Sequence, residues 1–173
     1  MIENTISNKE KLNVSNDLQF RMYDTAPEHV KNFYKINHEK QTYEYVTNLK
    51  RDIYPLKKFK TNFKNLENII LNIVDDSDPD FIEGSQLIHN LYTAEACRIL
   101  FPDEDWMHLV GFLHDYGKIL MHKDFYNLPS WSVVGDIFPV GCGFSKKIVY
   151  YDYLYANPDF NNELYNSELG VYE

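Results

Sequence analysis

The sequence predicts a mainly α-helical protein, and three observations support this prediction. Several stretches place apolar side chains at the spacing of a helix that is buried on one face. Residues that favour helix starts precede two of these stretches, Pro27 in the first turn of one and Asp103 as the N-cap of another. The 173 residues contain neither an internal repeat nor a low-complexity tract, and this length suits one domain with a sizeable core.

The composition limits the classes of protein and partner. Aromatic residues make up 16% of the chain, which excludes a largely disordered protein. The formal net charge of −9 argues against a nucleic acid or an anionic membrane surface as partner. Residues 1–18 are polar, are expected to form a mobile tail, and lack the apolar core of a signal peptide. With two isolated cysteines and no apolar stretch long enough to span a membrane, the chain is expected to be soluble and cytoplasmic.

The first half of the chain is expected to hold three helices. One long helix over residues 28–49 follows Pro27. A second, over 65–74, ends at the acidic turn of residues 75–80, where a proline disfavours helix at the preceding residue. A third runs over 85–100. The apolar residues on which these three helices are predicted are Val30, Phe33, Tyr34, Tyr45, Val46, Leu49, Leu66, Ile69, Ile70, Ile73, Leu87, Ile88, Leu91 and Ile99.

The second half is expected to hold two more helices separated by a loop. A fourth helix runs over residues 104–122 and begins at Asp103. Residues 129–145 combine prolines and glycines with apolar side chains. This segment is too hydrophobic to remain in water, so it is predicted to be an ordered loop. A short aromatic helix over residues 146–155 follows.

The candidate chemistry centres on the pair His114-Asp115 in the fourth predicted helix. A carboxylate among apolar neighbours is costly without a partner. Lys118 follows three residues after Asp115 and would share its helix face. The three side chains can form part of a metal site, or they can be a surface histidine beside an Asp–Lys ion pair. This helix by itself leaves both interpretations open.

His89, on the preceding helix, favours the metal site. A distant histidine followed by a His-Asp pair offers imidazoles and a carboxylate, which suit iron, manganese or another octahedral divalent ion. A bridging carboxylate such as Asp115 could hold two metals. The remaining histidines lack this context and are expected not to bind metal, namely His29, His38, His108 and His122.

Two polar segments have both a structural and a ligand-binding interpretation. The acidic turn, which begins with Asp75, Asp76 and Ser77, suits a backbone turn but can equally accept hydrogen bonds from a polyhydroxylated ligand. At Gly135 and Asp136 the glycine permits close backbone approach and the aspartate offers an acceptor. Neither segment identifies a substrate by itself.

Taken together, these segments resemble the myo-inositol oxygenase family, di-iron enzymes with an HD-domain-like helical bundle. The spacing of His89 from His114-Asp115 is shared with a large phosphohydrolase superfamily, whereas HLVGFLHDYGK and WSVVGDIFPVGC in this order are specific. Residues 19–173 are therefore expected to form a partial domain of this family. The matching segments are residues 20–23, 34–35, 41–42, 75–80, 89, 93–95, 102–118, 131–142, 157–159 and 167–172.

The resemblance implies oxidation of myo-inositol by O2 at a pair of irons, with ring cleavage to D-glucuronate. By position, His89 and His114 would bind one iron and Asp115 would bridge the two. Lys118 would contact the inositol and favour its alkoxide, as a nearby cation should. The residues that would hold the ring hydroxyls are Arg21, Asp75, Asp76, Ser77, Lys118, Gly135 and Asp136.

The resemblance also implies metal ligands beyond Glu173. Members of the family continue past this point, and the additional part supplies two more histidines and an aspartate to the irons. The hypothesis is a helical bundle that is incomplete at its C-terminus, holds half of the metal ligands, is inactive alone, and self-associates through exposed core surface. Two alternatives stay open: an HD-type metal-dependent phosphohydrolase, and a non-catalytic truncated homologue that binds inositol or a partner chain.

Overall fold

The computed structural model describes residues 23–53, 61–77, 85–135, 137–165 and 167–173. These residues form helices and loops without a β-strand, which confirms the predicted mainly α class. The α-helices are α1 (Glu28–Lys40), α2 (Tyr43–Asp52), α3 (Phe63–Leu71), α4 (Gln86–Leu100) and α5 (Asp105–Leu113). The 3-10 helices are η1 (Tyr23–Thr25), η2 (Tyr116–Met121), η3 (Ser130–Ser132), η4 (Tyr151–Ala156), η5 (Glu163–Tyr165) and η6 (Gly170–Tyr172).

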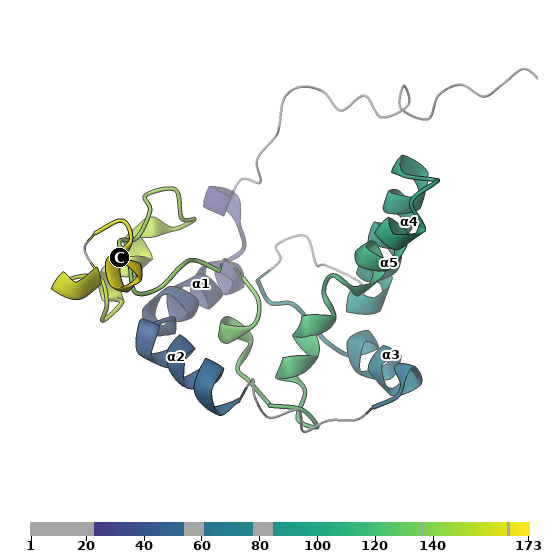
Figure 1. Cartoon of the computed structure of the whole chain (residues 1–173), viewed down its shortest axis with the longest axis horizontal. Coiled ribbons are helices and arrows are strands. Elements are labelled where there is room, and N and C mark those ends of the chain that lie inside the picture. Colours follow the sequence, from purple (N-terminus) through teal and green to yellow (C-terminus); the bar gives the residue numbers. More distant parts are fainter. Residues whose placement is uncertain (1–22, 54–60, 78–84, 136, 166) are drawn as a thin grey trace, which may run out of the picture.

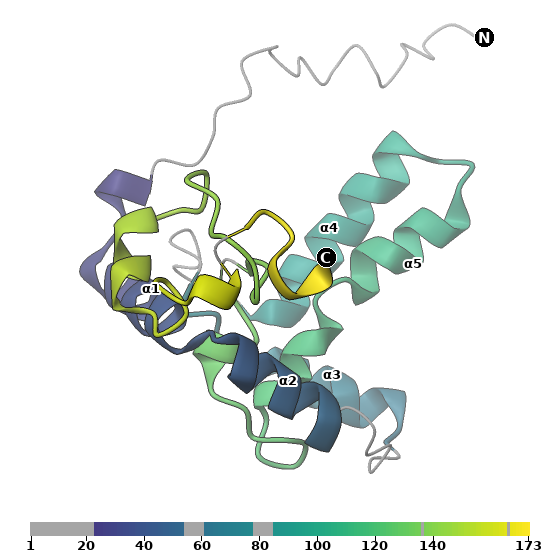
Figure 2. The same cartoon turned by 60° about the vertical axis from the view of Figure 1, so that its left-hand side comes forward.

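The helices gather on two sides of the molecule. α1, α2 and the C-terminal segment lie on one side of Figure 1, where η4 packs against α1. α4 and α5 form a hairpin of adjacent helices on the other side, and α3 contacts both α4 and η2 (Figures 1 and 2). No helix in the described part of the chain has the length and hydropathy that a membrane span requires. The tail expected over residues 1–18 lies outside the described residues.

The side that holds α1 contains an aromatic core, which we define as the two clusters of buried apolar residues found there and the rings packed on them. α1 contributes Val30, Phe33 and Tyr34, all of which the sequence placed on its apolar face. The ring of Tyr34 meets that of Tyr150 edge to face, with centroids 5.3 Å apart. The buried residues of the aromatic core are Ala26, Val30, Phe33, Tyr34, Val134, Phe138, Val140 and Leu154. The loop predicted to be ordered over residues 129–145 supplies three of these eight, as expected.

The single long helix predicted over residues 28–49 is wrong, because the chain breaks between α1 and α2. The Thr42 hydroxyl accepts a hydrogen bond from the first turn of α2 and acts as its N-cap. The backbone N–H of Tyr43 donates to the carboxylate of Asp159 over 2.6 Å, and the Asn157 amide donates to the carbonyl that precedes Thr42. Residues more than a hundred positions away thus fix the break, so local apolar spacing could not reveal it.

Of the other four helix predictions, two are borne out and two are wrong in part or in full. The helix over 85–100 is confirmed with Ser85 as its N-cap, and the one over 65–74 is present as the shorter α3. The helix predicted over 104–122 is wrong beyond Leu113, and its N-cap is Glu104 instead of Asp103. The helix predicted over 146–155 is also wrong, since only the 3-10 helix η4 forms there. It starts after Tyr150, whose left-handed conformation (φ 53°) interrupts any helix from the N-terminal side.

The α4–α5 hairpin is packed closely on its inner side and uncovered on its outer side. A Cβ atom placed on Gly111 would lie 2.9 Å from Sγ of Cys97 and 3.0 Å from Cα of Ala94, so only glycine permits this approach. The outer side carries large exposed side chains, including Tyr92 with 74% of its surface accessible. We call this surface the apolar face of the hairpin: Ile88, Leu91, Tyr92, Trp106, Leu109 and Val110.

Candidate metal centre

Three side chains that the sequence singled out meet at one end of the hairpin. The Nε2 atoms of His89 and His114 lie 3.3 Å apart. The Oδ2 atom of Asp115 lies 3.4 Å from the first and 3.2 Å from the second. Among the described residues, these three form the group of metal-ligand side chains whose donor atoms could share one ion. Their donor atoms make a nearly equilateral triangle.

The packing of α4 on α5 brings these residues together. His89 belongs to α4, and His114 and Asp115 immediately follow α5 instead of lying inside a longer helix as predicted. Asp115 has left the helical conformation (φ −102°, ψ 6°) and stands before η2. The metal-ligand group therefore depends on where α5 ends as well as on the spacing of the His-Asp pair.

One hydrogen bond fixes which nitrogen of His114 faces the group. Its Nδ1 atom lies 2.7 Å from the backbone oxygen of Gly111, which can only accept. Nδ1 is therefore the donor in this contact, which leaves Nε2, beside His89 and Asp115, as the atom that could bind a metal. This arrangement, in which the second ring nitrogen donates to a carbonyl, is typical of histidines that bind metals.

The donor set fits a divalent metal such as iron. Two imidazoles and one carboxylate on a single face, with other positions open, are the ligands of non-haem Fe(II) sites. The side chain of His89 is 45% exposed and that of His114 is 34% exposed, so coordination positions on the solvent side are accessible to other ligands. A structural zinc site would instead enclose its ion with four protein ligands, mainly cysteine and histidine.

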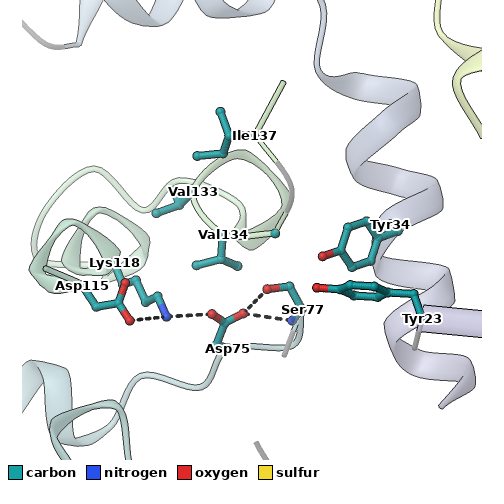
Figure 3. A pocket seen from close by; sticks show the side chains of 10 residues that line it. Tyr23, Tyr34, Asp75, Ser77, Asp115, Lys118, Val133, Val134 and Ile137 are labelled. Atoms are coloured by element: carbon teal, nitrogen blue, oxygen red, sulfur yellow. Dashed lines mark hydrogen bonds and ion pairs between the residues drawn. The ribbon is translucent and has the colours of Figure 1, made fainter. Parts of the chain in front are cut away.

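Lys118 links the metal-ligand group to a second carboxylate. Its ammonium lies 2.9 Å from Oδ2 of Asp115 and 2.7 Å from Oδ2 of Asp75, and it donates to Oε1 of Gln86 over 2.8 Å. The side chain is only 14% exposed, so the ion pairs are weakly screened by water. The Lys118 ammonium is thus held between two carboxylates at the boundary of the site (Figure 3).

A pocket of about 340 Å³ lies beside this cation. Its polar wall comes from Asp75, Ser77, Asp115 and Lys118, and the hydroxyls of Tyr23 and Tyr34 point toward Ser77 in Figure 3. Asp75 is held in place because its Oδ1 atom accepts from both the backbone and the hydroxyl of Ser77. The remaining lining residues are Val133, Val134, Gly135 and Ile137.

Gly135 is a position where the pocket requires glycine. Its φ is +90°, a conformation that other residues rarely adopt. A Cβ atom there would lie 2.6 Å from the ring of Phe33. The backbone of the loop can therefore approach α1 closely, and this brings Gly135 and Ser77 to the same pocket.

The structure brings most of the sequence candidates together. Asp75, Ser77 and Gly135 line the pocket with Asp115 and Lys118. Asp76 is exposed and is not among the lining residues. Arg21 and Asp136 lie outside the described residues.

Sequence reasoning missed several residues around the site. Tyr23 and Tyr34 stand in segments that carried the family resemblance, yet neither was assigned to a pocket. Gln86 and Asn90 are the buried residues of α4, and they flank His89 on the same helix. Their burial, which is known only from the structure, indicates that both amides have hydrogen-bond partners inside the protein, because buried polar side chains are nearly always paired.

Tyr116 follows the metal-ligand group directly in the chain. Its ring packs against Phe112, with centroids 5.4 Å apart, and against Phe63 of α3. Burial raises the pKa of its phenol, and the negative charge of Glu67 raises it further. Tyr116 therefore stays protonated and neutral beside Asp115.

Comparisons with known proteins agree with this geometry. Residues 27–173 match the family described as myo-inositol oxygenase. The chain is 44% identical over 156 residues to inositol oxygenase 1 of Arabidopsis thaliana, covering 88% of the chain and 50% of that relative. It is 40% identical over 158 residues to the inositol oxygenase of Dictyostelium discoideum, covering 90% of the chain and 54% of that relative.

The same coverage holds for a mammalian relative. The chain is 38% identical over 157 residues to the inositol oxygenase of Rattus norvegicus, covering 89% of the chain and 54% of that relative. The chain thus spans about half the length of the curated relatives it matches. Since the family match covers most of the chain, the chain belongs to the myo-inositol oxygenase family, with its HD-like helical fold.

Proposed function

We propose that this chain binds iron at His89, His114 and Asp115 and myo-inositol in the adjoining pocket, as part of an inositol oxygenase centre. The reaction of that centre is the O2-dependent cleavage of the ring to D-glucuronate. The observation that carries the proposal is the position of Asp115. Its Oδ2 atom belongs to the metal-ligand group and also contacts Lys118 in the pocket wall. Family membership supports the choice of substrate.

Different pocket residues make different kinds of contact with a polyol. Asp75 and Ser77 offer oxygen acceptors for ring hydroxyls, and the Lys118 ammonium stabilises the negative charge of a hydroxyl that has lost its proton. Bound iron would activate oxygen and act as a Lewis acid. The apolar wall orients the ring and excludes water from one side. The proposal also assigns hydroxyl contacts to Arg21, Asp76 and Asp136.

We propose a single iron for this chain alone. A second iron could share Asp115, but no other group of three metal-ligand side chains converges there among the described residues. Three protein ligands hold one ion, while the second would have only the bridging carboxylate. The chain by itself is therefore expected to bind iron without turning over inositol.

The charges of the pocket weigh against phosphate-ester hydrolysis. Among the described lining residues, Lys118 is the cation, and it stands beside the carboxylates of Asp75 and Asp115. A doubly charged phosphate would need more positive charge than this wall provides. A neutral polyol suits a wall of carboxylate, hydroxyl and one ammonium group.

The test is a metal count combined with ligand binding on the whole chain. The protein is loaded anaerobically with Fe(II), freed of excess metal and analysed for iron, and inositol binding is measured by calorimetry. We expect one iron per chain, loss of iron in His114→Ala, and full iron content in His29→Ala, since His29 is exposed on α1.

Three results would contradict parts of this proposal. Absence of iron from the wild-type chain would refute the metal site. Two irons per chain with glucuronate formation would refute the single-iron, inactive state. Hydrolysis of phosphate esters without inositol binding would favour the phosphohydrolase alternative.

A further inference from the structure

Gln86 is a buried amide between the metal-ligand group and the pocket. It is the first residue of α4 and stands one helical turn before His89. Only 1% of its surface is exposed, although a glutamine at the start of a helix is usually in water. A buried polar side chain of this size must find partners inside the protein.

Both polar atoms of this amide are used. Oε1 accepts from the ammonium of Lys118 over 2.8 Å. Nε2 donates to Oδ2 of Asp115 over 2.7 Å and to Oδ1 of Asn90 over 3.0 Å. One neutral side chain therefore contacts the carboxylate of the metal-ligand group and the cation of the pocket at the same time.

Several groups compete for the Oδ2 atom of Asp115. It accepts from Gln86, faces the Lys118 ammonium at 2.9 Å, and lies within 3.4 Å of both imidazoles. A metal ion and an ammonium repel each other when they share one oxygen. Gln86 carries no charge, so it can continue to donate to Asp115 when a metal binds there.

The amide of Gln86 also keeps a hydrogen bond with Lys118 when a metal binds Asp115. With a metal on Asp115, the ammonium still has the carbonyl of Gln86 at 2.8 Å and the carboxylate of Asp75 at 2.7 Å. Of these two partners, Asp75 itself lines the pocket together with Lys118. Lys118 thus stays in the pocket wall.

We propose that Gln86 is a positioning residue that orients Asp115 toward the metal and holds Lys118 at the substrate pocket. The inference rests on the proposed function, and it adds a residue that couples metal binding to substrate binding. The hydrogen bond to Asp115 acts on the metal, and the one to Lys118 acts on inositol. The two effects are separable because different atoms of the amide make the two contacts.

A double-mutant cycle tests this coupling. Gln86→Met, Lys118→Met and the double variant are compared for Fe(II) affinity and for the inositol affinity of the iron-loaded chain. Gln86→Met is expected to weaken iron binding about 10- to 100-fold, the usual effect of losing a partner of a metal ligand. It should also weaken inositol binding in the wild-type background but have no further effect on inositol in the Lys118→Met background.

Two controls separate positioning from folding. Glu95→Gln alters an exposed residue of the same helix and should leave both affinities unchanged. Thermal unfolding followed by circular dichroism shows whether each variant is folded. If Gln86→Met does not fold, Gln86→Asn keeps the amide but is one methylene too short to reach both partners, and it should show the same losses.

The outcomes distinguish this inference from the proposed function. If the wild-type chain binds iron and inositol and folded Gln86 variants bind both equally well, the role of Gln86 is refuted and the proposed function stands. Additive losses of inositol affinity in the cycle would refute the action through Lys118. A wild-type chain that binds iron but not inositol would refute the proposed substrate, while the effect of Gln86 on iron affinity would still be measured.

Discussion

Helices α1 and α4 differ in whether they bury large apolar side chains. α1 buries Val30, Phe33 and Tyr34 in the aromatic core, together with the polar Asn37 and His38. α4 buries Gln86 and Asn90, and it leaves Ile88, Leu91 and Tyr92 exposed on the apolar face of the hairpin. Both helices have apolar residues at helical spacing, so the two sequences look alike in this respect.

The difference shows what stabilises each region. The side that holds α1 is stabilised by burial of apolar surface, the dominant favourable contribution to folding. The inner side of α4 carries the polar network around Lys118, and the exposed apolar side chains of this helix contribute little to the described fold. Large exposed apolar side chains gathered on one pair of helices are typical of an interaction surface.

The largest difference in stability between the two regions is expected from substituting one aromatic residue in each. Phe33→Ala removes a buried ring of the aromatic core and should lower the free energy of unfolding by about 3–5 kcal/mol. Tyr92→Ala removes an exposed ring of α4 and should change it by less than about 0.5 kcal/mol. Chemical denaturation of both variants measures the two values. Equal losses would mean that the hairpin is buried in solution.

A substitution at the contact between α1 and the pocket loop should lower the free energy of unfolding almost as much as Phe33→Ala. Gly135→Ala forces a side chain into the ring of Phe33 and an L-residue into a positive φ, which together should cost about 2–4 kcal/mol. Gly117→Ala is the matched control, because a Cβ atom at Gly117 meets nothing within 4 Å. Thermal unfolding compares the two variants, and a neutral Gly135→Ala would contradict the close approach.

The third-largest loss of stability is expected from a substitution in the polar network near α4. Asp75→Asn removes a charged partner of Lys118 and should lower the free energy of unfolding by about 1–3 kcal/mol, the range for hydrogen bonds to charged groups. It should also weaken inositol binding. Asp76→Asn changes the exposed neighbour and is the control for stability only, because the proposed function also gives Asp76 a contact with inositol. An unchanged free energy of unfolding in Asp75→Asn would contradict a stabilising ion pair between Asp75 and Lys118.

The apolar face should matter more for association than for stability. The double variant Leu91→Gln, Leu109→Gln should change the free energy of unfolding by less than about 1 kcal/mol, because both side chains are exposed. It should reduce binding of a hydrophobic dye and any self-association seen by sedimentation velocity. An unfolded double variant would place these leucines in a core.

The smallest expected effect is the change in stability with pH that Tyr150 of the aromatic core causes. Burial raises the pKa of the Tyr150 phenol, and the nearby Tyr153 and Asp24 add to the increase. The folded chain favours the neutral phenol, so the free energy of unfolding is at its full value below the usual pKa of 10.0 and decreases as the pH rises above it. Tyr150→Phe should flatten this decrease in denaturation curves measured from pH 8 to 11.

The sequence predicted helices better than it predicted their ends. The helix over 85–100 follows from local spacing and the cap at Ser85. The break before Tyr43 depends on Asp159 and Asn157, which are distant in sequence. The end of α5 at Leu113 leaves His114 and Asp115 outside the helix, although the apolar pattern continues beyond them. Apolar periodicity encodes neither of these two helix ends, and the first of them depends on tertiary contacts.

The candidate site shows the same division. The spacing of His89 from the His-Asp pair predicted a metal-ligand group, and the three side chains lie together in the structure. Gln86 escaped notice because glutamine near a helix start has an ordinary role in capping and solvation. Its contacts with Lys118 and Asp115 exist only after α4 packs on α5 and η2.

The sequence by itself determined the mainly α class, the family resemblance and the residue types of the metal-ligand group, because each depends on local spacing or on specific strings of residues. Only the tertiary structure decided which face of α4 is buried. A helix with apolar residues at helical spacing can turn any side inward, and the choice depends on what the neighbouring helices offer. Lys118 and Asp115 lie next to α4, so the helix buries Gln86 and Asn90 and leaves Ile88, Leu91 and Tyr92 exposed.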